Sequence, residues 1–305
     1  MSNLPTHSLD RRNDGVGPVR AHGASRPAKA LREFCGKAPA YLPLLIWAIP
    51  TLLGFYFVII TSLKTNQEIF QGAWALPKRP VFENYVRAWD TAHVGHYFSN
   101  SLLVTIGSVA LTAVTASLAA YVLARFQFPG NRISYMLFLA GLMIPICLTL
   151  VPLYELAAKL HMANSLLGLI VISSVFTLPF SVFVLTSFFR SLPSELADAA
   201  LVDGCGELGV FWRIMLPLGA PGVITTSIFN ALYVWNDYLL PLILIVSSNR
   251  RTLPLGVMGL SGAAGSSMDW AALYAGLVLL IAPSLVTYLL LQSRIESSIT
   301  LGALK

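Results

Sequence analysis

One carboxylate, Asp237, lies well inside an apolar stretch of the chain, in the run Trp235-Asn236-Asp237-Tyr238. Placing an ionised aspartate at the centre of a bilayer costs about 3 kcal/mol, so this side chain should face a cavity or a partner. Aromatic faces with amide and carboxylate groups suit the binding of a sugar along a path through the membrane. The alternative is that Asp237 caps or bridges neighbouring helices. Tyr154, near the end of another apolar stretch, is a further candidate for the path.

The other reactive residues do not assemble into an enzyme. No Gly-x-x-x-x-Gly-Lys-Ser/Thr loop is present, so any ATP and magnesium must be bound by a partner. The Gly-Leu-Ser-Gly run at 259–262 resembles that of serine proteases, but no histidine follows His161 to act as its base. No His-Glu-x-x-His motif occurs, and Cys35, Cys147 and Cys205 are far apart. We therefore predict a protein that is not an enzyme and that has no metal site and no cofactor of its own.

The composition places most of the chain in lipid. It is 56% hydrophobic and 11% charged, whereas a soluble protein carries about 25% charged residues. Six apolar stretches each have about the twenty residues that a helix needs to cross a bilayer, where backbone groups must bond internally. They are Tyr41–Leu63, Leu102–Leu123, Ile133–Leu153, Ser165–Phe189, Gly222–Val246 and Ala271–Leu291. The sequence therefore predicts an all-α membrane protein with six transmembrane helices.

Prolines inside the apolar stretches predict kinked or interrupted helices around a pathway, because neighbouring helices or a water-lined cavity can satisfy the freed backbone groups. These prolines are Pro50, Pro145, Pro152, Pro179, Pro241 and Pro283.

The first 39 residues differ from the rest. They are polar, rich in Gly, Pro and Arg, and lack apolar periodicity, which predicts a disordered basic tail before a membrane domain at 40–305. Lys and Arg are more numerous in the tail and the segments on its side than in the opposite segments. Because positive residues stay inside, both termini are predicted to be cytoplasmic.

The stretch Ser191–Ala220, here named the hairpin, separates the fourth and fifth apolar stretches and is predicted to lie on the cytoplasmic side. Its pattern predicts two short amphipathic helices. The first begins at Ser191 as N-cap with Pro193 in the first turn, and it ends at Gly204. The second runs to Pro217. The predicted apolar faces consist of Leu196, Ala199 and Ala200, then Leu208, Phe211, Trp212 and Met215.

The sequence ELADAALVDGCGELGVFWRIMLP within the hairpin resembles the cytoplasmic coupling loop of ABC importer permeases. Asp198 matches the family pattern as an acid, although Glu is usual at that position. The sequence departs from the pattern at Ala197 and Cys205. The resemblance extends over roughly residues 40–305, including Asn100-Ser101-Leu102 and the C-terminal Thr300–Lys305, and is strongest to the maltose-type carbohydrate permeases. The matching hairpin residues are Asp198, Ala199, Ala200, Asp203, Gly204, Phe211, Ile214, Leu216 and Pro217.

This resemblance implies a type I importer permease core in the inner (plasma) membrane. The chain would be one subunit of a heteromeric, ATP-driven importer that moves a sugar or sugar-like solute by alternating access. The implied partners are a second homologous permease subunit, an ABC ATPase dimer and an extracytoplasmic solute-binding protein, with no nucleic acid. The apolar side of the hairpin would fill a groove on one ATPase, where Glu195, Asp198 and Asp203 would fix its register.

The alternative is a self-sufficient secondary carrier or channel for a small polar solute. Such a protein would need several intramembrane acids, whereas Asp237 is the one well inside an apolar stretch, and the two halves of the chain show no convincing internal repeat.

Overall fold

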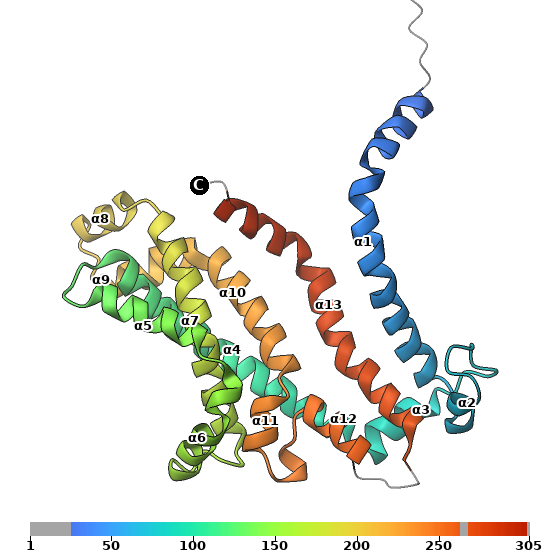
Figure 1. Ribbon diagram of the computed structural model, residues 1–305. Helices are drawn as coiled ribbons and strands as arrows, with labels where there is room; N and C mark the ends of the chain where they lie inside the picture. The colour runs from blue at the N-terminus through green and yellow to red at the C-terminus, as the bar shows by residue number, and fades with distance from the viewer. Residues whose placement is uncertain (1–25, 263–267, 304–305) are drawn as a thin grey trace, which may run out of the picture. The chain divides into compact units, whose positions relative to one another are not determined.

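The computed structural model describes residues 26–262 and 268–303, and the side chains of residues 41, 43–260 and 268–290. Every element in the described ranges is helical (Figure 1). In chain order the elements are α1 (Arg26–Ser62), α2 (Asn66–Gln71), α3 (Glu83–Val86), η1 (Arg87–Thr91), α4 (Val94–Arg125), α5 (Asn131–Met143), α6 (Ile146–Lys159), α7 (Leu166–Ser191), α8 (Glu195–Val202), α9 (Glu207–Val210), η2 (Phe211–Met215), α10 (Leu216–Asn236), α11 (Leu239–Leu244), η3 (Ser248–Arg250), α12 (Leu253–Gly262) and α13 (Trp270–Ala303).

The chain divides into two units, residues 1–54 and 55–305. The first unit contains most of α1. The first 25 residues of the predicted tail lie outside the described residues, and the backbone is helical from Arg26 onward. The residues before the first apolar stretch include Ala, Leu, Lys and Arg, which favour helix, and Pro27 is tolerated in a first turn. Trp47 is exposed, as expected of a side chain that faces lipid.

The predicted membrane class is confirmed. In the described ranges, five helices are long and apolar enough to cross a membrane, or up to six if the bent pair α5 and α6 forms one span. The single spans are Pro43–Ser62, Val94–Arg125, Leu166–Ser191, Glu207–Asn236 and Trp270–Leu290.

The third predicted span, Ile133–Leu153, is not one helix. The chain bends by 105° between helices α5 and α6. Ile144 has an extended conformation, because the ring of Pro145 disfavours the helical conformation in the residue before it. The break therefore lies at a proline, and it turns α6 away from the axis of α5.

The fifth predicted span, Gly222–Val246, is also divided, between α10 and α11. Asp237 is extended at the break, and its Oδ1 accepts hydrogen bonds from the backbone N–H groups of Leu239 at 3.0 Å and Leu240 at 3.4 Å. A side-chain oxygen that binds the first free N–H groups of a helix is a cap. The carboxylate thus stabilises the start of α11.

Helices α4, α7 and α10 form the centre of the second unit. Hydroxyl groups join α4 to α7: Ser174 Oγ donates to the carbonyl oxygen of Ser108 at 3.2 Å, and the Oγ1 atoms of Thr112 and Thr177 are 2.8 Å apart. Small polar side chains allow helix backbones to approach closely in a membrane and add hydrogen bonds between them. Helices α4 and α7 therefore form a closely joined pair.

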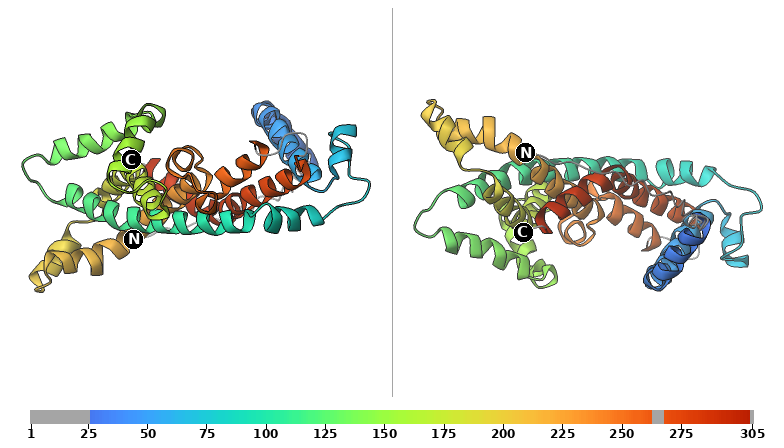
Figure 2. Two further views of the ribbon diagram at one scale, coloured as in Figure 1. Left: turned by 90° about the horizontal axis from the view of Figure 1, so that it is seen from below. Right: turned by 90° about the horizontal axis from the view of Figure 1, so that it is seen from above.

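The second unit has two ends. The α4–α5 turn, α8 and α9 lie at one end, and α6, α11 and α12 lie at the other (Figure 1). Helix α13 runs from the end with α12 toward the end with α8. Helix α5 and the hairpin lie on opposite sides of the end of α4 (Figure 2).

Candidate functional site

The first hairpin helix, α8, starts later than predicted. Ser191 is the last residue of α7, and its Oγ donates to the carbonyl oxygen of Phe188 at 2.7 Å, so Ser191 is not an N-cap. Pro193 keeps Leu192 extended, and α8 begins at Glu195 after Ser194. The chain therefore makes a sharp, proline-fixed corner between α7 and α8.

The predicted stop at Gly204 is confirmed. Gly204 has a φ of 84°, in the left-handed region that favours glycine. Its N–H bonds to the carbonyl oxygen of Leu201 at 3.0 Å, and the N–H of Cys205 bonds to that of Ala200 at 3.0 Å. These two bonds form a Schellman motif, which satisfies the last carbonyl groups of α8 and reverses the chain.

The second hairpin helix does not end at Pro217. It continues from α9 through the π-helical turn η2 into α10, and the N–H of Leu216 bonds to the carbonyl oxygen of Phe211 across the wide turn. Proline has no N–H and its ring crowds the preceding turn, and a wider turn relieves both problems. The second half of the hairpin is thus a direct extension of a membrane-spanning helix.

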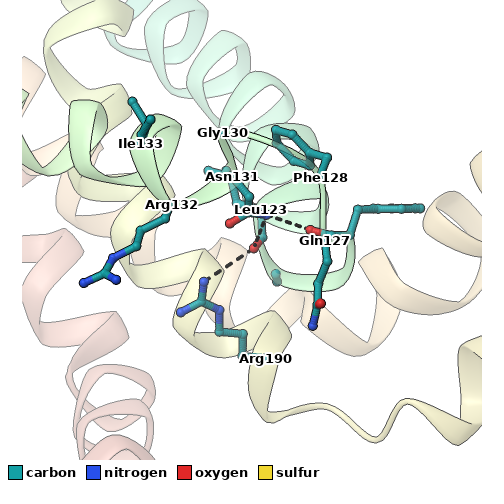
Figure 3. Close-up of a pocket in the computed structure, with 10 residues that line it drawn as sticks. Leu123, Gln127, Phe128, Gly130, Asn131, Arg132, Ile133 and Arg190 are labelled. Carbon is teal, nitrogen blue, oxygen red and sulfur yellow. Dashed lines mark hydrogen bonds between the residues drawn. The ribbon is translucent and has the colours of Figure 1, made fainter.

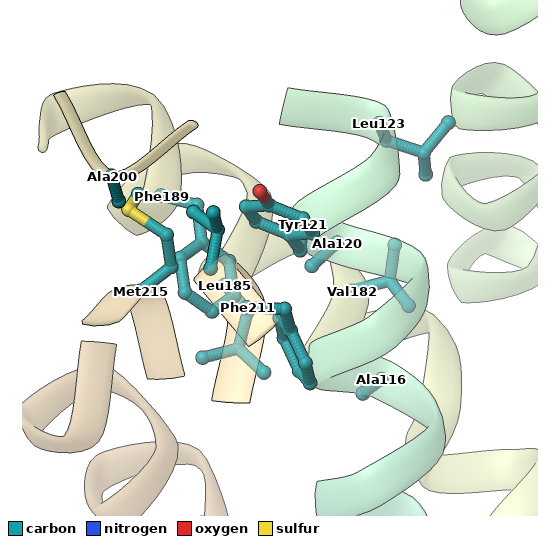
Figure 4. Packing of buried hydrophobic residues seen from close by; sticks show 11 residues of the cluster. Ala116, Ala120, Tyr121, Leu123, Val182, Leu185, Phe189, Ala200, Phe211 and Met215 are labelled. Atoms are coloured by element: carbon teal, nitrogen blue, oxygen red, sulfur yellow. The ribbon is translucent and has the colours of Figure 1, made fainter. Parts of the chain in front are cut away.

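Both predicted apolar faces are split between an inner and an outer side. Ala200, Phe211 and Met215 are buried in a cluster with side chains from α4 and α7 (Figure 4). Val202 is 87% exposed and Leu208 is 70% exposed, although both are apolar. Leu196, Ala199 and Trp212 are exposed as well. The hairpin therefore has one side fixed to the membrane helices and one apolar side open.

Direct contacts attach the hairpin to α4. The ring of Phe211 lies 5.1 Å from that of Tyr121, measured between centroids. Arg125 Nη2 donates to the carbonyl oxygen of Leu192 at 2.7 Å, at the corner before α8. On the α7 side, Gly219 approaches Phe189 so closely that a Cβ would come within 2.5 Å of the phenyl ring. A force on the hairpin would therefore reach α4 and α7 through packed atoms.

The four acids of the hairpin are exposed and make no ion pair with any residue whose side chain is described. They are Glu195, Asp198, Asp203 and Glu207. The open side of the hairpin thus combines apolar groups with negative charge, which suits a partner groove with apolar walls and basic residues.

A cavity of about 500 Å³ lies where α5 bends into α6, between α7 and α10. Thr177 and Asn230 contribute polar groups to its lining, together with Tyr233 and the rings of Phe180 and Phe229. Asn230 is 3% exposed, and its Nδ2 donates to Ser181 Oγ at 2.8 Å. Aromatic faces beside an amide and hydroxyl groups are able to bind a polar, uncharged ring compound.

The structure does not bring the residues predicted for the substrate path together at this cavity. Trp235 is 6% exposed, and its Nε1 donates to the carbonyl oxygen of Leu280 in α13 at 3.0 Å. Asn236 Nδ2 donates a hydrogen bond to Ser284 Oγ, also in α13, and Asp237 caps α11. Tyr238 packs in a hydrophobic cluster that contains residues of α6 and α7, and Tyr154 is exposed on α6.

Sequence reasoning missed two residues with clear roles in this geometry. From the sequence, Arg125 is only one of the positive residues on the side of the tail, whereas in the structure it donates a hydrogen bond to Leu192 at the corner before α8. Asn230 is an amide in the middle of an apolar stretch, and that property is itself the signal for a polar residue facing a cavity or a partner. No group of three or more His, Cys, Asp or Glu residues in the described ranges is placed to bind a metal.

Comparisons with known proteins fit this geometry. The family model described as "Binding-protein-dependent transport system inner membrane component" matches residues 112–300, which include the hairpin. The chain is 37% identical to the diacetylchitobiose uptake system permease protein NgcG of Streptomyces coelicolor, over 92% of this chain and 93% of that protein. It is 31% identical to the melibiose/raffinose/stachyose import permease protein MelC of Bacillus subtilis, over 86% of this chain and 94% of that protein.

A crystal structure of a bacterial ABC transporter involved in the import of the acidic polysaccharide alginate has the same fold. Its TM-score is 0.73 at 20% identity, over 89% of this chain and 98% of that chain.

Proposed function

Because this chain belongs to the family of inner membrane components of binding-protein-dependent transport systems, we propose that an ATPase partner opens its solute path by moving the hairpin. The chain is a multi-pass inner membrane protein and the permease subunit of an ABC importer, and ATP hydrolysis takes place in a separate subunit. ATP and magnesium are therefore assigned to that partner.

The observation that carries the proposal is the two-sided hairpin. Phe211 and Met215 fix its inner side in the cluster with α4 and α7, whereas Val202 and Leu208 leave an open apolar surface. Exposed apolar residues beside polar ones are typical of a protein–protein interface. The open side would fill a groove on the ATPase, and Glu195, Asp198 and Asp203 would set its register.

The contacts of the hairpin define how motion reaches the cavity. When the ATPase dimer closes, the hairpin moves with the ATPase groove in which it is docked. The hairpin then carries α4 and α7 along. Helix α5 contacts α7 where Gly141 faces Pro179, with a Cβ position 3.1 Å from the proline ring. The bend at Pro145 separates α5 from α6 at the same cavity. Displacement of α7 against α5 would therefore open or close the cavity, which is alternating access.

The excess of Lys and Arg on the tail side supports a cytoplasmic location for the hairpin and for both termini. A second homologous permease subunit would complete the path, an ATPase dimer would bind on the cytoplasmic side, and a solute-binding protein would deliver the solute on the other side.

The substrate that we propose is an uncharged di- or oligosaccharide. No charged residue lines the cavity, and its aromatic rings, with Asn230, Thr177 and Tyr233, suit sugar rings and hydroxyl groups. The relatives NgcG and MelC are described as the permease proteins of a diacetylchitobiose uptake system and of melibiose, raffinose and stachyose import, and these solutes are sugars of this class.

Uptake by proteoliposomes tests this function. Vesicles would contain the full-length chain with its co-purified subunits, a candidate binding protein outside, and ATP and magnesium inside or absent. We expect uptake of radiolabelled diacetylchitobiose or raffinose only with internal ATP. Uptake by the purified chain alone without ATP would instead support the alternative, a self-sufficient carrier or channel.

A further inference from the structure

A second cavity, of about 580 Å³, lies at the turn between α4 and α5, at the same end of the unit as the hairpin. Two arginines contribute to its lining, Arg132 from α5 and Arg190 from the end of α7 (Figure 3). No carboxylate lines it. The pocket therefore carries two positive charges without a countercharge of its own.

The two guanidinium groups are largely free to bind an anion. One N–H of Arg190 donates to the carbonyl oxygen of Leu123 at 3.4 Å, and its guanidinium carbon lies 5.2 Å from the ring centre of Tyr135. A guanidinium has five N–H donors, so most of those of Arg190 have no protein acceptor among the described residues. Arg132 is exposed and makes no hydrogen bond or ion pair with a described residue.

The rest of the lining is apolar and open. Phe128 and Ile133 are exposed beside the arginines, and Phe126 is partly exposed. The turn connects the long apolar helix α4 to the apolar α5, so we expect it at the boundary between hydrocarbon and water. A soluble phosphate would bind the arginines but leave the apolar side chains exposed. A phospholipid carries both a phosphate and an acyl chain, so it could contact the arginines and the apolar side chains together.

We propose that this pocket binds the headgroup of an anionic phospholipid. The phosphate accepts hydrogen bonds from Arg132 and Arg190, and an acyl chain lies along Phe128 and Ile133. The assignment to the cytoplasmic leaflet rests on the proposed orientation of the importer. Helix α5 and the hairpin lie on opposite sides of the end of α4, so this site is separate from the open side of the hairpin (Figure 2). A bound lipid would hold the base of α5 against the end of α7.

Photolabelling in nanodiscs tests the site. The full-length chain with its co-purified subunits is placed in neutral phosphatidylcholine with a small fraction of phosphatidylglycerol that carries a diazirine in its acyl chain. Labelled peptides are then mapped by mass spectrometry. We expect labelling of residues 126–133 that falls by about tenfold in Arg132→Gln/Arg190→Gln, because two charge-assisted hydrogen bonds are lost. Arg79→Gln, which removes an exposed arginine outside this pocket, is the matched control and should label as the unmodified protein does.

Two outcomes would overturn the proposal. Equal labelling in the double variant would show that the arginines do not select the lipid. Loss of labelling with excess free glycerol phosphate would identify a soluble anion as the ligand. The single variant Arg132→Gln alters an exposed side chain that makes no hydrogen bond or ion pair with a described residue, so a reduction in that variant is not explained by the loss of such a bond. Labelling needs neither ATP nor sugar, so its result does not depend on whether the chain transports a sugar.

Discussion

The ring of Phe211 in the hairpin lies 5.1 Å from the ring of Tyr121 in α4, with an angle of 46° between the planes. Phe211 is buried, whereas the adjacent Trp212 is exposed, and the two rings contact each other at 5.0 Å. Neighbouring aromatic residues thus serve two different surfaces, one inside the protein and one open to a partner.

Phe211→Ala should release the hairpin from α4. Removing a buried phenylalanine typically costs about 3–5 kcal/mol, so the melting temperature of the purified protein should fall and ATP-driven uptake should be lost. Trp212→Ala is the matched control for a half-exposed residue, and it should lower the melting temperature less than Phe211→Ala does while weakening retention of the ATPase. Equal thermal destabilisation by both variants would show that the two sides of the hairpin are not distinct.

Gly204→Val should disrupt the reversal after α8, because a β-branched residue is strongly disfavoured at a φ of 84°. Gly206→Val is the control: Gly206 has a φ of −70° and a ψ of 159°, and no atom lies within 4 Å of its Cβ position. We expect uptake in proteoliposomes to fall severely in the first variant and to persist in the second, with both inserted in the membrane. Full uptake by Gly204→Val would mean that the shape of the hairpin is not important for coupling.

Asp237→Asn separates the two roles considered for this carboxylate. An amide oxygen can still cap the N–H groups of Leu239 and Leu240, so a purely structural Asp237 predicts nearly normal uptake. Asp237→Ala removes the cap and should cost about 1 kcal/mol of stability. A loss of uptake in the Asn variant at normal stability would instead indicate that the charge contacts the solute.

Asn230→Leu tests the cavity against the predicted path. Ser181 Oγ would still donate to the carbonyl oxygen of Thr177 after losing the amide, so the helices should remain packed. We expect a lower affinity for sugar with ATP hydrolysis retained. Asn236→Leu removes an amide of the same type that bonds to Ser284, outside the cavity lining. If only Asn236→Leu reduced sugar affinity, the path would follow the 235–238 run instead.

The sequence was sufficient to predict the spans and the hairpin, because length and apolarity determine a membrane helix and a fixed motif marks the hairpin. It predicted kinked or interrupted helices at six prolines, Pro145 among them, but not which of them would bend its helix. It also left open whether Asp237 caps a helix or lines a path. Several other prolines lie inside helices without a bend of this kind, among them Pro179 and Pro283. Whether a proline bends a helix depends on neighbours that the local pattern does not contain.

The sequence also did not predict which residues on the apolar faces of the hairpin are buried and which are exposed. Leu208 and Phe211 share one helical face by spacing, yet Leu208 is open and Phe211 is buried. Periodicity predicts that a face will be covered, but it does not distinguish coverage by the same chain from coverage by a partner. The same limit applied to Asn230, whose significance depends on the cavity beside it.

At the end of the second unit opposite the hairpin, Arg87 and Asp269 form an ion pair at 2.9 Å. Burial alone would raise the pKa of Asp269, but hydrogen bonds from Arg87 and from the N–H of Ala272 hold the pKa below its usual value. Because the pKa is lower in the folded state, the carboxylate stabilises the fold above its unfolded pKa of about 4, and this contribution is lost as pH falls through the folded value.

Asp269→Asn should therefore lower the melting temperature at pH 7. The difference from the unmodified protein should shrink as the pH falls below about 4, and it should vanish below the folded-state pKa of Asp269. Asp90→Asn, at an exposed acid that forms no ion pair with any residue in the described ranges, should change little at either pH. A difference for Asp269→Asn that persists in acid would assign the effect to packing instead of charge.

Co-purification most directly tests whether the hairpin holds an ATPase. The tagged full-length chain would be purified from its native membrane, and the bound ATPase activity would be measured for the unmodified protein and for Val202→Asp/Leu208→Asp. Both residues are exposed, so the double variant should fold and insert normally. We expect an ATPase to co-purify with the unmodified chain and to be lost with the variant. Equal ATPase activity in the two preparations, or none with the unmodified chain, would contradict this expectation.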